Sequence, residues 1–167
     1  MGRPLAEFNG DRIYLDTNVL VGLLDRTSAY HGPCDAFFRR ATQANPPIRL
    51  VTAVLTMDEL VFVLLQELLA RDPYGVSQSR SRYLSDHPSV VCDLMQQIAP
   101  LCQPLESLVT WVAVTPDDVW FMQETMTETG MLPRDAIHFA VLSRLGIPAI
   151  ASDDEIFDQT AVERFYP

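Results

Sequence analysis

The sequence predicts an α/β fold, with a mostly parallel central sheet between two layers of helices. Short β-type segments alternate along the chain with longer segments of helical periodicity, an order typical of a parallel sheet covered on both faces. With 167 residues, of which 48% are hydrophobic and 20% charged, the chain has the composition of a globular protein with its own core. No internal repeat or linker divides it, so we expect a single domain over residues 1–167.

The first half of the chain is expected to contain two strands, each leading into a helix. After a polar lead-in, these elements are a strand at 12–15, helices at 19–25 and 30–44, a strand at 48–52 and a helix at 54–71. Thr17 or Asn18 is expected to cap the first helix, because short polar side chains accept hydrogen bonds from free N–H groups. Asn45-Pro46-Pro47 and Asp72-Pro73-Tyr74-Gly75 are turn signals that end the second and third helices.

The second half is expected to supply two more strands. Its elements are a helix from residue 89, a strand at 110–114, helices at 115–129 and 133–145, and a strand at 148–151. The segment 76–87 is polar and rich in Ser and Arg, which is typical of a mobile surface loop. Pro100 is expected to break the preceding helix. Trp111 and Trp120 are expected in the core because both lie in regular elements. Thr115-Pro116 is a typical helix start.

Composition and charge limit the possible functions. The formal net charge is −10 and the pI is about 4.5, which argues against general attraction to nucleic acid. Bound metal ions or a local Arg cluster can still reverse the field at one cleft. The three cysteines show neither metal-ligand spacing nor a disulfide framework, as in proteins of a reducing cytosol. With no signal peptide and no apolar run long enough to span a membrane, the chain is expected in the cytoplasm.

Four carboxylates occur where a parallel sheet would bring them together. Asp16 directly follows the first expected strand and Asp154 follows the fourth, while Glu59 and Asp135 lie on helices next to the second and fourth strands. Ligands bind beyond the carboxyl ends of such strands. Converging carboxylates repel one another, and a divalent cation resolves the repulsion. Oxygen ligands favour Mg²⁺ or Mn²⁺, ions that bind phosphate oxygens and lower the pKa of water. This chemistry fits phosphodiester hydrolysis.

Each of these acids also has a structural interpretation when it is taken alone. Asp16 is typical of a turn that leaves a strand, and Asp135 complements the positive end of its helix dipole. Glu59 is an ordinary helix acid, although apolar residues on its face indicate a partly enclosed carboxylate. His138 is expected to be a packed histidine or a hydrogen-bond partner of Asp135. Arg134 is expected to be solvated or in a salt bridge, with RNA phosphate binding as the alternative.

Four short motifs in this order resemble those of the PIN-domain ribonucleases, with the VapC-type toxins of bacterial toxin–antitoxin pairs as the most similar branch. The motifs are Leu15-Asp16-Thr17-Asn18, Thr52 with Glu59, Arg134-Asp135-Ala136-Ile137-His138-Phe139-Ala140, and Ser152-x-Asp154-x-x-Phe157. The resemblance extends from about residue 12 to residue 158. It implies a three-layer α/β/α sandwich and an endoribonuclease in which water attacks the RNA phosphate and leaves a 5′-phosphate on one product.

The resemblance also implies site residues, a cofactor and partners. Mg²⁺ or Mn²⁺ would be held by an acidic cluster, with smaller polar residues positioning ligands or water. On this basis the acids are Asp16, Glu59, Asp135 and Asp154, and the polar residues are Thr17, Asn18 and Ser152. Asp153 is a further candidate metal ligand beside Asp154, and the spacing to Phe157 favours Asp154. The implied partners are RNA, a small antitoxin that inserts a basic or apolar segment across the site, and a second copy in a homodimer.

Two other functions remain open from the sequence. In the first, the chain is a non-catalytic relative that binds a partner, and its acids hold metal weakly or not at all. In the second, it is an Asp-dependent phosphatase built on Asp16. The haloacid-dehalogenase pattern requires a second Asp two residues later, where this chain has Asn18, so the phosphatase is the weaker alternative.

Overall fold

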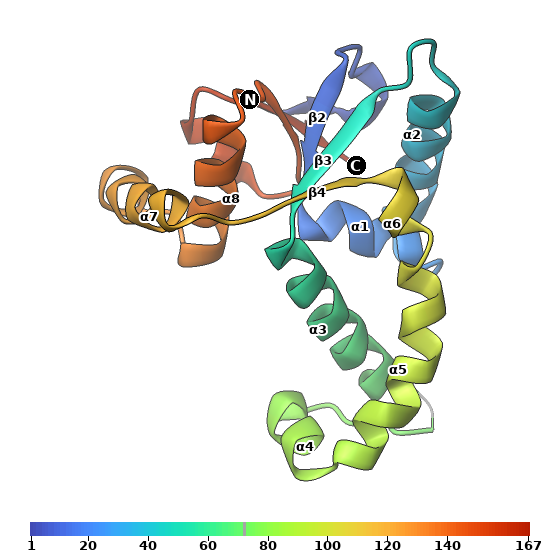
Figure 1. The fold of residues 1–167 in the computed structure, drawn as a ribbon. Coiled ribbons are helices and arrows are strands. Elements are labelled where there is room, and N and C mark those ends of the chain that lie inside the picture. The colour runs from blue at the N-terminus through green and yellow to red at the C-terminus, as the bar shows by residue number, and fades with distance from the viewer. Residues whose placement is uncertain (72) are drawn as a thin grey trace.

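A parallel sheet with helices on both faces forms the centre of the protein, as the sequence predicts (Figure 1). The computed structural model describes residues 1–71 and 73–167. The strands are β1 (Arg3–Pro4), β2 (Arg12–Leu15), β3 (Arg49–Ala53), β4 (Thr110–Val112), β5 (Ala149–Ala151) and β6 (Glu163–Tyr166). They form one sheet in the order β1-β6-β5-β2-β3-β4, and every neighbouring pair is parallel. All the strands therefore end at the same edge.

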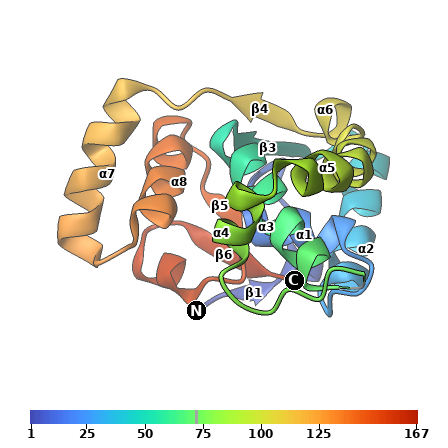
Figure 2. The same cartoon turned by 90° about the horizontal axis from the view of Figure 1, so that it is seen from below.

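The helices fall into two layers that cover opposite faces of this sheet (Figure 2). The helices are α1 (Thr17–Leu24), α2 (His31–Gln43), α3 (Leu55–Ala70), α4 (Arg80–Asp86), α5 (Pro88–Cys102), α6 (Leu105–Leu108), α7 (Pro116–Thr129) and α8 (Pro133–Arg144), with short 3₁₀ turns η1 (Leu5–Glu7) and η2 (Glu155–Gln159). Helices α7 and α8 lie on one face, and α1, α2, α3 and α5 on the other. Helices α3 and α5 extend beyond the sheet, and α4 lies at their far end (Figure 1).

The strands divide the buried side chains into two cores. In β2, Ile13 and Leu15 pack with α1, α2, α3 and α5, while Tyr14 between them packs with α8. In β3, Leu50 packs in the first of these cores and Val51 in the second. Successive strand residues point to opposite faces, so a strand buried on both sides is apolar at every position. In the described part of the chain, no helix is both long and apolar enough to cross a membrane.

Several local expectations from the sequence are wrong. Residues 80–86 form α4 rather than a mobile loop, because Leu84 is buried in the first core. Helix α5 continues through Pro100, since its buried stripe extends past the proline and packing outweighs one lost hydrogen bond. Trp120 is 64% exposed, because α7 packs on α8 and leaves its outer face uncovered. Asp72, in an expected turn, lies outside the described residues.

Two strands were not expected. The edge strand β1 and its neighbour β6 pair near the two ends of the described chain, where Arg3 and Phe165 are register partners. Strand β6 also pairs with β5, and through this pairing the Ser152 N–H donates to the carbonyl of Phe165 at 2.9 Å. The second half of the chain therefore supplies three strands, and the last of them borders the loop that carries Ser152 and Asp154.

Candidate active site

Asp16 lies immediately after β2 and begins helix α1. Its Oδ1 accepts the Thr17 N–H at 2.6 Å, so Asp16 rather than Thr17 or Asn18 is the N-cap. Its Oδ2 accepts the Ser152 hydroxyl at 2.6 Å and the Asn18 amide at 2.7 Å. Burial raises the pKa of Asp16 above its usual value, although His138 and these hydrogen bonds act in the opposite direction. The candidate polar residues thus surround the first acid.

Glu59 reaches the same place from helix α3. The residue is only 4% exposed, which confirms the enclosed carboxylate expected from its apolar neighbours. Its Oε2 accepts the Thr17 hydroxyl at 2.6 Å, and Thr17 also donates its N–H to Asp16. One residue therefore joins two carboxylates that are far apart in the sequence.

His138 connects Glu59 to the opposite core rather than to Asp135. Its Nε2 lies 3.2 Å from Glu59 Oε2, and its Nδ1 lies 2.9 Å from the Tyr14 hydroxyl. Tyr14 also accepts the N–H of Ala53 at 3.1 Å. Burial would lower the pKa of His138, but the hydrogen bond to Glu59 and the negative charges of Asp16, Glu59 and Asp135 outweigh it and raise the pKa. Burial would raise the pKa of Glu59, but the hydrogen bonds from His138 and Thr17 outweigh it and lower the pKa.

Asp135 lies in the first turn of α8 and is partly exposed. Its pKa is raised to about 6, mainly by burial and also by the negative charges of Asp154, Asp16 and Glu59, while the charge of His138 acts in the opposite direction. Like charges have this effect only over short distances. The raised pKa of Asp135 thus indicates electrostatic coupling to the other three predicted acids.

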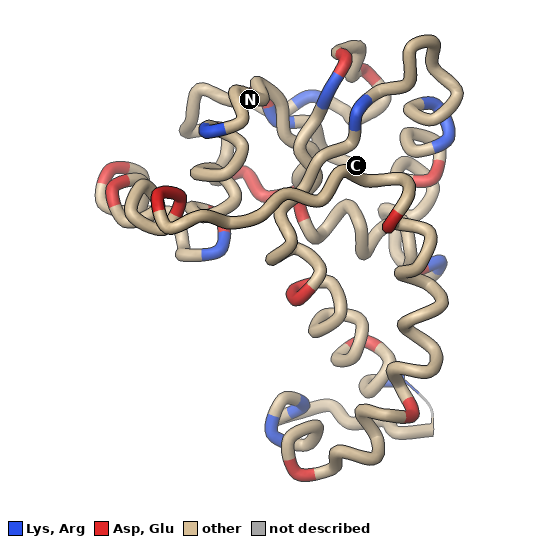
Figure 3. The backbone as a smooth tube through the Cα atoms, viewed as in Figure 1, with Lys and Arg blue, Asp and Glu red and all other residues tan. Residues whose placement is uncertain are grey.

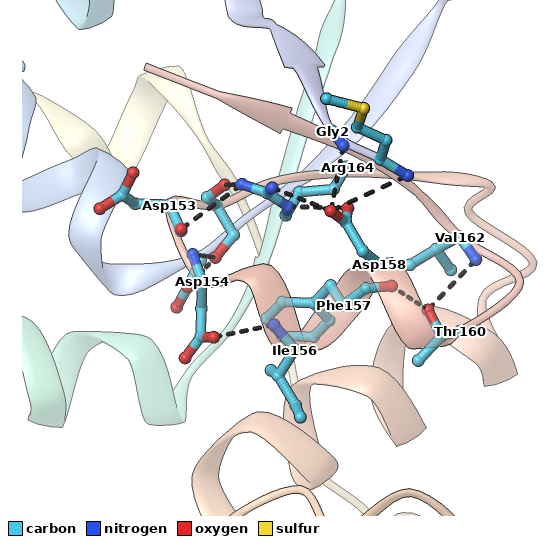
Figure 4. A network of polar contacts seen from close by, with 12 residues as sticks. Gly2, Asp153, Asp154, Ile156, Phe157, Asp158, Thr160, Val162 and Arg164 are labelled. Carbon is cyan, nitrogen blue, oxygen red and sulfur yellow. Dashed lines mark hydrogen bonds and ion pairs between the residues drawn. The ribbon is translucent and has the colours of Figure 1, made fainter.

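The loop after β5 directs its two aspartates to different partners (Figure 4). The Asp153 carboxylate accepts the hydroxyl of Tyr30 at 2.6 Å. The Asp154 carboxylate accepts the Ile156 N–H at 2.9 Å and caps η2. The negative charge of Asp154 helps to raise the pKa of Asp135. The two aspartates therefore differ in role: Asp153 bonds to Tyr30, while Asp154 caps η2 and acts electrostatically on Asp135.

The remaining oxygen of Glu59 tests whether these residues suit a cation. Glu59 Oε1 is buried and has no hydrogen-bond partner within the described residues. Arg134 Nε lies 3.2 Å from it, in an ion pair that lacks hydrogen-bond geometry. A buried carboxylate oxygen without a donor is costly. Together with the mutual repulsion at Asp135, this oxygen fits a site for a hard divalent cation with oxygen ligands.

The candidate side chains are not already arranged to bind a metal ion. Across residues 1–71 and 73–167, no three Asp, Glu, His or Cys side chains stand together in a metal-binding arrangement. Asp16 and Glu59 instead hold hydroxyl, amide and imidazole partners. Binding a cation here would therefore exchange internal hydrogen bonds for metal ligation.

Positive charge is sparse around the acids and gathers elsewhere. Arg12 and Arg49 are the first residues of β2 and β3, so they lie at the edge of the sheet opposite to Asp16 (Figure 3). Sequence reasoning placed Arg134 in a salt bridge, which the ion pair with Glu59 confirms. It missed Tyr14 and Tyr30. The alternation of side chains along β2 could have identified Tyr14, because it directs the Tyr14 side chain to the face of the sheet that α8 covers.

Comparison with known proteins identifies the fold. The PIN domain family model matches residues 13–163. Among curated proteins, none is significantly similar in sequence. The structure of VapC20 from Mycobacterium tuberculosis, described as a Sarcin-Ricin loop cleaving toxin, superposes with a TM-score of 0.56 at 21% identity and covers 90% of this chain and 97% of that one. VapBC2 from Rickettsia felis, bound to a promoter DNA fragment, superposes with a TM-score of 0.60 at 9% identity, covering 93% and 98%.

Proposed function

The chain belongs to the PIN-domain family, and on this premise we propose that it is an endoribonuclease that hydrolyses RNA phosphodiester bonds with Mg²⁺ or Mn²⁺. One observation carries the proposal: Thr17 hydrogen-bonds both Asp16 and Glu59. The pKa of Asp135, raised by burial and by the charges of Asp154, Asp16 and Glu59, agrees with it. An acidic cluster of this kind at the carboxyl ends of parallel strands suits a divalent cation and a phosphate ligand.

In this proposal the four acids hold the cation through their carboxylate oxygens. The ligands are Asp16, Glu59, Asp135 and Asp154, and Asp153 is a further candidate. Once bound, the cation supplies positive charge to the phosphate oxygens and lowers the pKa of a water molecule. The acids around the site would orient the attacking water, and a carboxylate oxygen not bound to the cation would accept its proton.

Other residues of the chain prepare the acids for this role. Thr17 fixes Glu59, and Asn18 and Ser152 fix the Asp16 carboxylate. The side chain of Arg134 is 58% exposed, so its guanidinium can leave Glu59 and bind a phosphate of the RNA backbone. Attack by water on the scissile phosphate would break the bond from phosphorus to the 3′ oxygen, and leave a 5′-phosphate on one product and a 3′-hydroxyl on the other.

We also propose that the protein is the toxin of a toxin–antitoxin pair. The VapC20 structure is described as that of a toxin, and a Klebsiella pneumoniae structure that superposes with a TM-score of 0.51 is described as a toxin–antitoxin complex. The proposed partner is a small antitoxin whose basic or apolar segment covers the acidic site. A basic segment matches the net charge of −10. The proposal includes a homodimer, a single domain over residues 1–167 and a cytoplasmic location.

A second candidate function is a non-catalytic PIN-domain protein that binds a partner. It is favoured by the internal hydrogen bonds that Asp16 and Glu59 already make, and by the lack of a prearranged set of three ligands in the described residues. Titration with Mn²⁺ in a calorimeter separates the two functions. Saturable binding supports the nuclease, and the absence of saturable heat favours the binding protein.

The nuclease is tested by incubating the protein with a panel of RNAs with and without Mg²⁺. We expect cleavage that requires the cation and gives products with 5′-phosphate ends. The Asp16→Asn variant should lose this cleavage by more than about 100-fold and stay folded, because Asn is as good an N-cap as Asp. Cleavage that persists without any divalent cation, or that Asp16→Asn leaves unchanged, would contradict the proposed mechanism.

A further inference from the structure

We propose that Arg164 is a positioning residue for the acid-bearing loop at residues 152–154. The inference rests on the proposed function, because it assigns to Arg164 the task of holding Ser152 and Asp154 where they serve the cation site. Arg164 lies on β6, outside every motif that predicts the site, and it is only 6% exposed. A buried guanidinium needs strong partners, and those partners show what it does.

The first partner of Arg164 is Asp158 at the end of η2. Arg164 Nε donates to Asp158 Oδ1 at 2.9 Å, and Nη2 donates to Oδ2 at 3.1 Å (Figure 4). The same Oδ2 accepts the Gly2 N–H at 3.1 Å. Two parallel bonds to one carboxylate fix both the position and the plane of the guanidinium. The third nitrogen is therefore held in one direction.

The third nitrogen points at the backbone of the acid-bearing loop. Arg164 Nη1 lies 3.3 Å from the carbonyl oxygen of Ser152 and 3.4 Å from that of Asp153 (Figure 4). Each contact is long, but both carbonyls face the same positive charge. Since the Ser152 N–H also bonds to Phe165 next to Arg164, β6 holds this turn through its backbone and through a side chain.

Fixing these carbonyls fixes groups of the candidate site. The Ser152 hydroxyl donates to Asp16 Oδ2 at 2.6 Å and accepts the Asp154 N–H at 3.0 Å. A rotation of the Ser152–Asp153 peptide would therefore disturb the orientation of Asp16 and the placement of Asp154 together. The partners that orient a ligand typically change metal affinity by 10- to 100-fold when they are removed.

The chain offers a matched control in Arg144. Its Nε donates to the buried carboxylate of Asp118 at 2.7 Å, and its Nη2 donates to the carbonyl of Ala113 at 2.9 Å. Arg144 thus also links a buried aspartate to a backbone carbonyl, but it lies nine residues after Asp135 on α8, at the far end of that helix. Its loss should cost stability without reaching the acids.

The test uses amide hydrogen exchange and calorimetric titration with Mn²⁺. Both measurements compare the wild type with three variants: Arg164→Met, Arg164→Lys and Arg144→Met. In Arg164→Met we expect the amides of residues 152–154 to exchange at least about tenfold faster, and the Mn²⁺ dissociation constant to rise by about tenfold or more. In Arg144→Met neither quantity should change. Arg164→Lys keeps a charge beside Asp158 but cannot reach both that carboxylate and the loop carbonyls, so both effects should persist with a smaller loss of stability.

The two measurements separate this inference from the proposed function. Wild-type exchange at residues 152–154 in both Arg164 variants would overturn the positioning role, even if the wild type cleaves RNA. Equal acceleration in Arg144→Met would overturn it too, because the effect would then follow from general destabilisation. If the wild type neither binds Mn²⁺ nor cleaves RNA while the loop loosens only in the Arg164 variants, the nuclease proposal fails and the positioning of the loop stands.

Discussion

The Thr17 hydroxyl donates a 2.6 Å hydrogen bond to the carboxylate of Glu59. The two residues are 42 positions apart in the chain, yet both are buried at the carboxyl end of neighbouring parallel strands. This contact attaches helix α3 to the start of helix α1. Because the Thr17 N–H also donates to Asp16, the contact links Asp16 to Glu59, the two most buried of the predicted acids.

Replacing Thr17 by valine should therefore destabilise the protein. The change preserves shape but removes the hydroxyl, and Glu59 Oε2 is left with the His138 ring as its partner. A buried acceptor that loses its donor typically costs about 1–3 kcal/mol. We expect a loss of this size in the free energy of unfolding measured with urea. Thr17→Ser, which retains the hydroxyl, should lose less; a Thr17→Val variant as stable as the wild type would contradict a stabilising role for this hydrogen bond.

Removal of Arg134 should tighten metal binding. Its guanidinium forms an ion pair with Glu59 Oε1, so it competes with a cation for that oxygen. A partly exposed pair of this kind is worth about 0.5–1 kcal/mol, which corresponds to about a two- to fivefold lower Mn²⁺ dissociation constant in Arg134→Ala. Calorimetric titration measures the change. Arg39→Ala, which removes a surface partner of Asp35 on α2, should have no effect, and weaker binding by Arg134→Ala would show that Arg134 does not compete.

Acid should destabilise the protein partly through Asp118. Burial alone would raise the pKa of this carboxyl, but hydrogen bonds from Arg144 and Thr115 outweigh it and hold the pKa below its ordinary value of 3.8. A carboxyl whose pKa is lower in the folded state contributes stability above its unfolded pKa, and that stability is lost as the pH falls through the folded pKa. The free energy of unfolding should therefore decrease below about pH 4.

Asp118→Asn should reduce the decrease in the free energy of unfolding that occurs at low pH. At neutral pH the variant should lose about 1–3 kcal/mol, because the ion pair with Arg144 and the capping box with Thr115 are both weakened. The neighbouring Asp117 is exposed, so Asp117→Asn serves as the control and should retain the wild-type pH dependence. If Asp118→Asn loses stability at low pH as the wild type does, other carboxyl groups cause that loss.

The sheet was predictable where strands are buried on both faces. The run at β2 is apolar and ends in Asp16, and the layered order of strands and helices follows from alternation along the chain. Strands β1 and β6 escaped notice because an edge strand and a strand that contains Glu163 and Arg164 have no continuous apolar run. Their pairing depends on a contact between opposite ends of the described chain, which local sequence patterns do not encode.

Predictions of helices and loops from local sequence were wrong where tertiary packing outweighed the helix propensity of the residues. The Ser- and Arg-rich segment folds as α4 because Leu84 finds a place in the core, and Pro100 lies within a helix whose buried face continues past it. Propensity is a weak guide in such cases because packing routinely overrides it. Conversely, Trp120 lies in a regular element but remains exposed, since a position in a helix does not determine which face is covered.

The neighbourhood of the acids was predictable from topology, but their partners were not. Asp16, Glu59 and Asp135 follow from the rule that parallel strands end at one edge. His138 is buried, as one of its two sequence-based interpretations predicts. Its bond to Glu59 rather than Asp135 depends on how far α3 and α8 approach across the edge of the sheet. Arg164 acts from a strand that the sequence pattern did not show, and its role required coordinates.

The most direct test of the central claim is a calorimetric titration of Mn²⁺ into the wild type and into Asp16→Asn. If Asp16, Glu59, Asp135 and Asp154 share a divalent cation, the wild type should bind Mn²⁺ saturably. Asp16→Asn should bind it more than about 100-fold more weakly while it remains folded. An absence of saturable binding in the wild type, or equal affinity in the two proteins, would contradict the claim that these acids form a cation site.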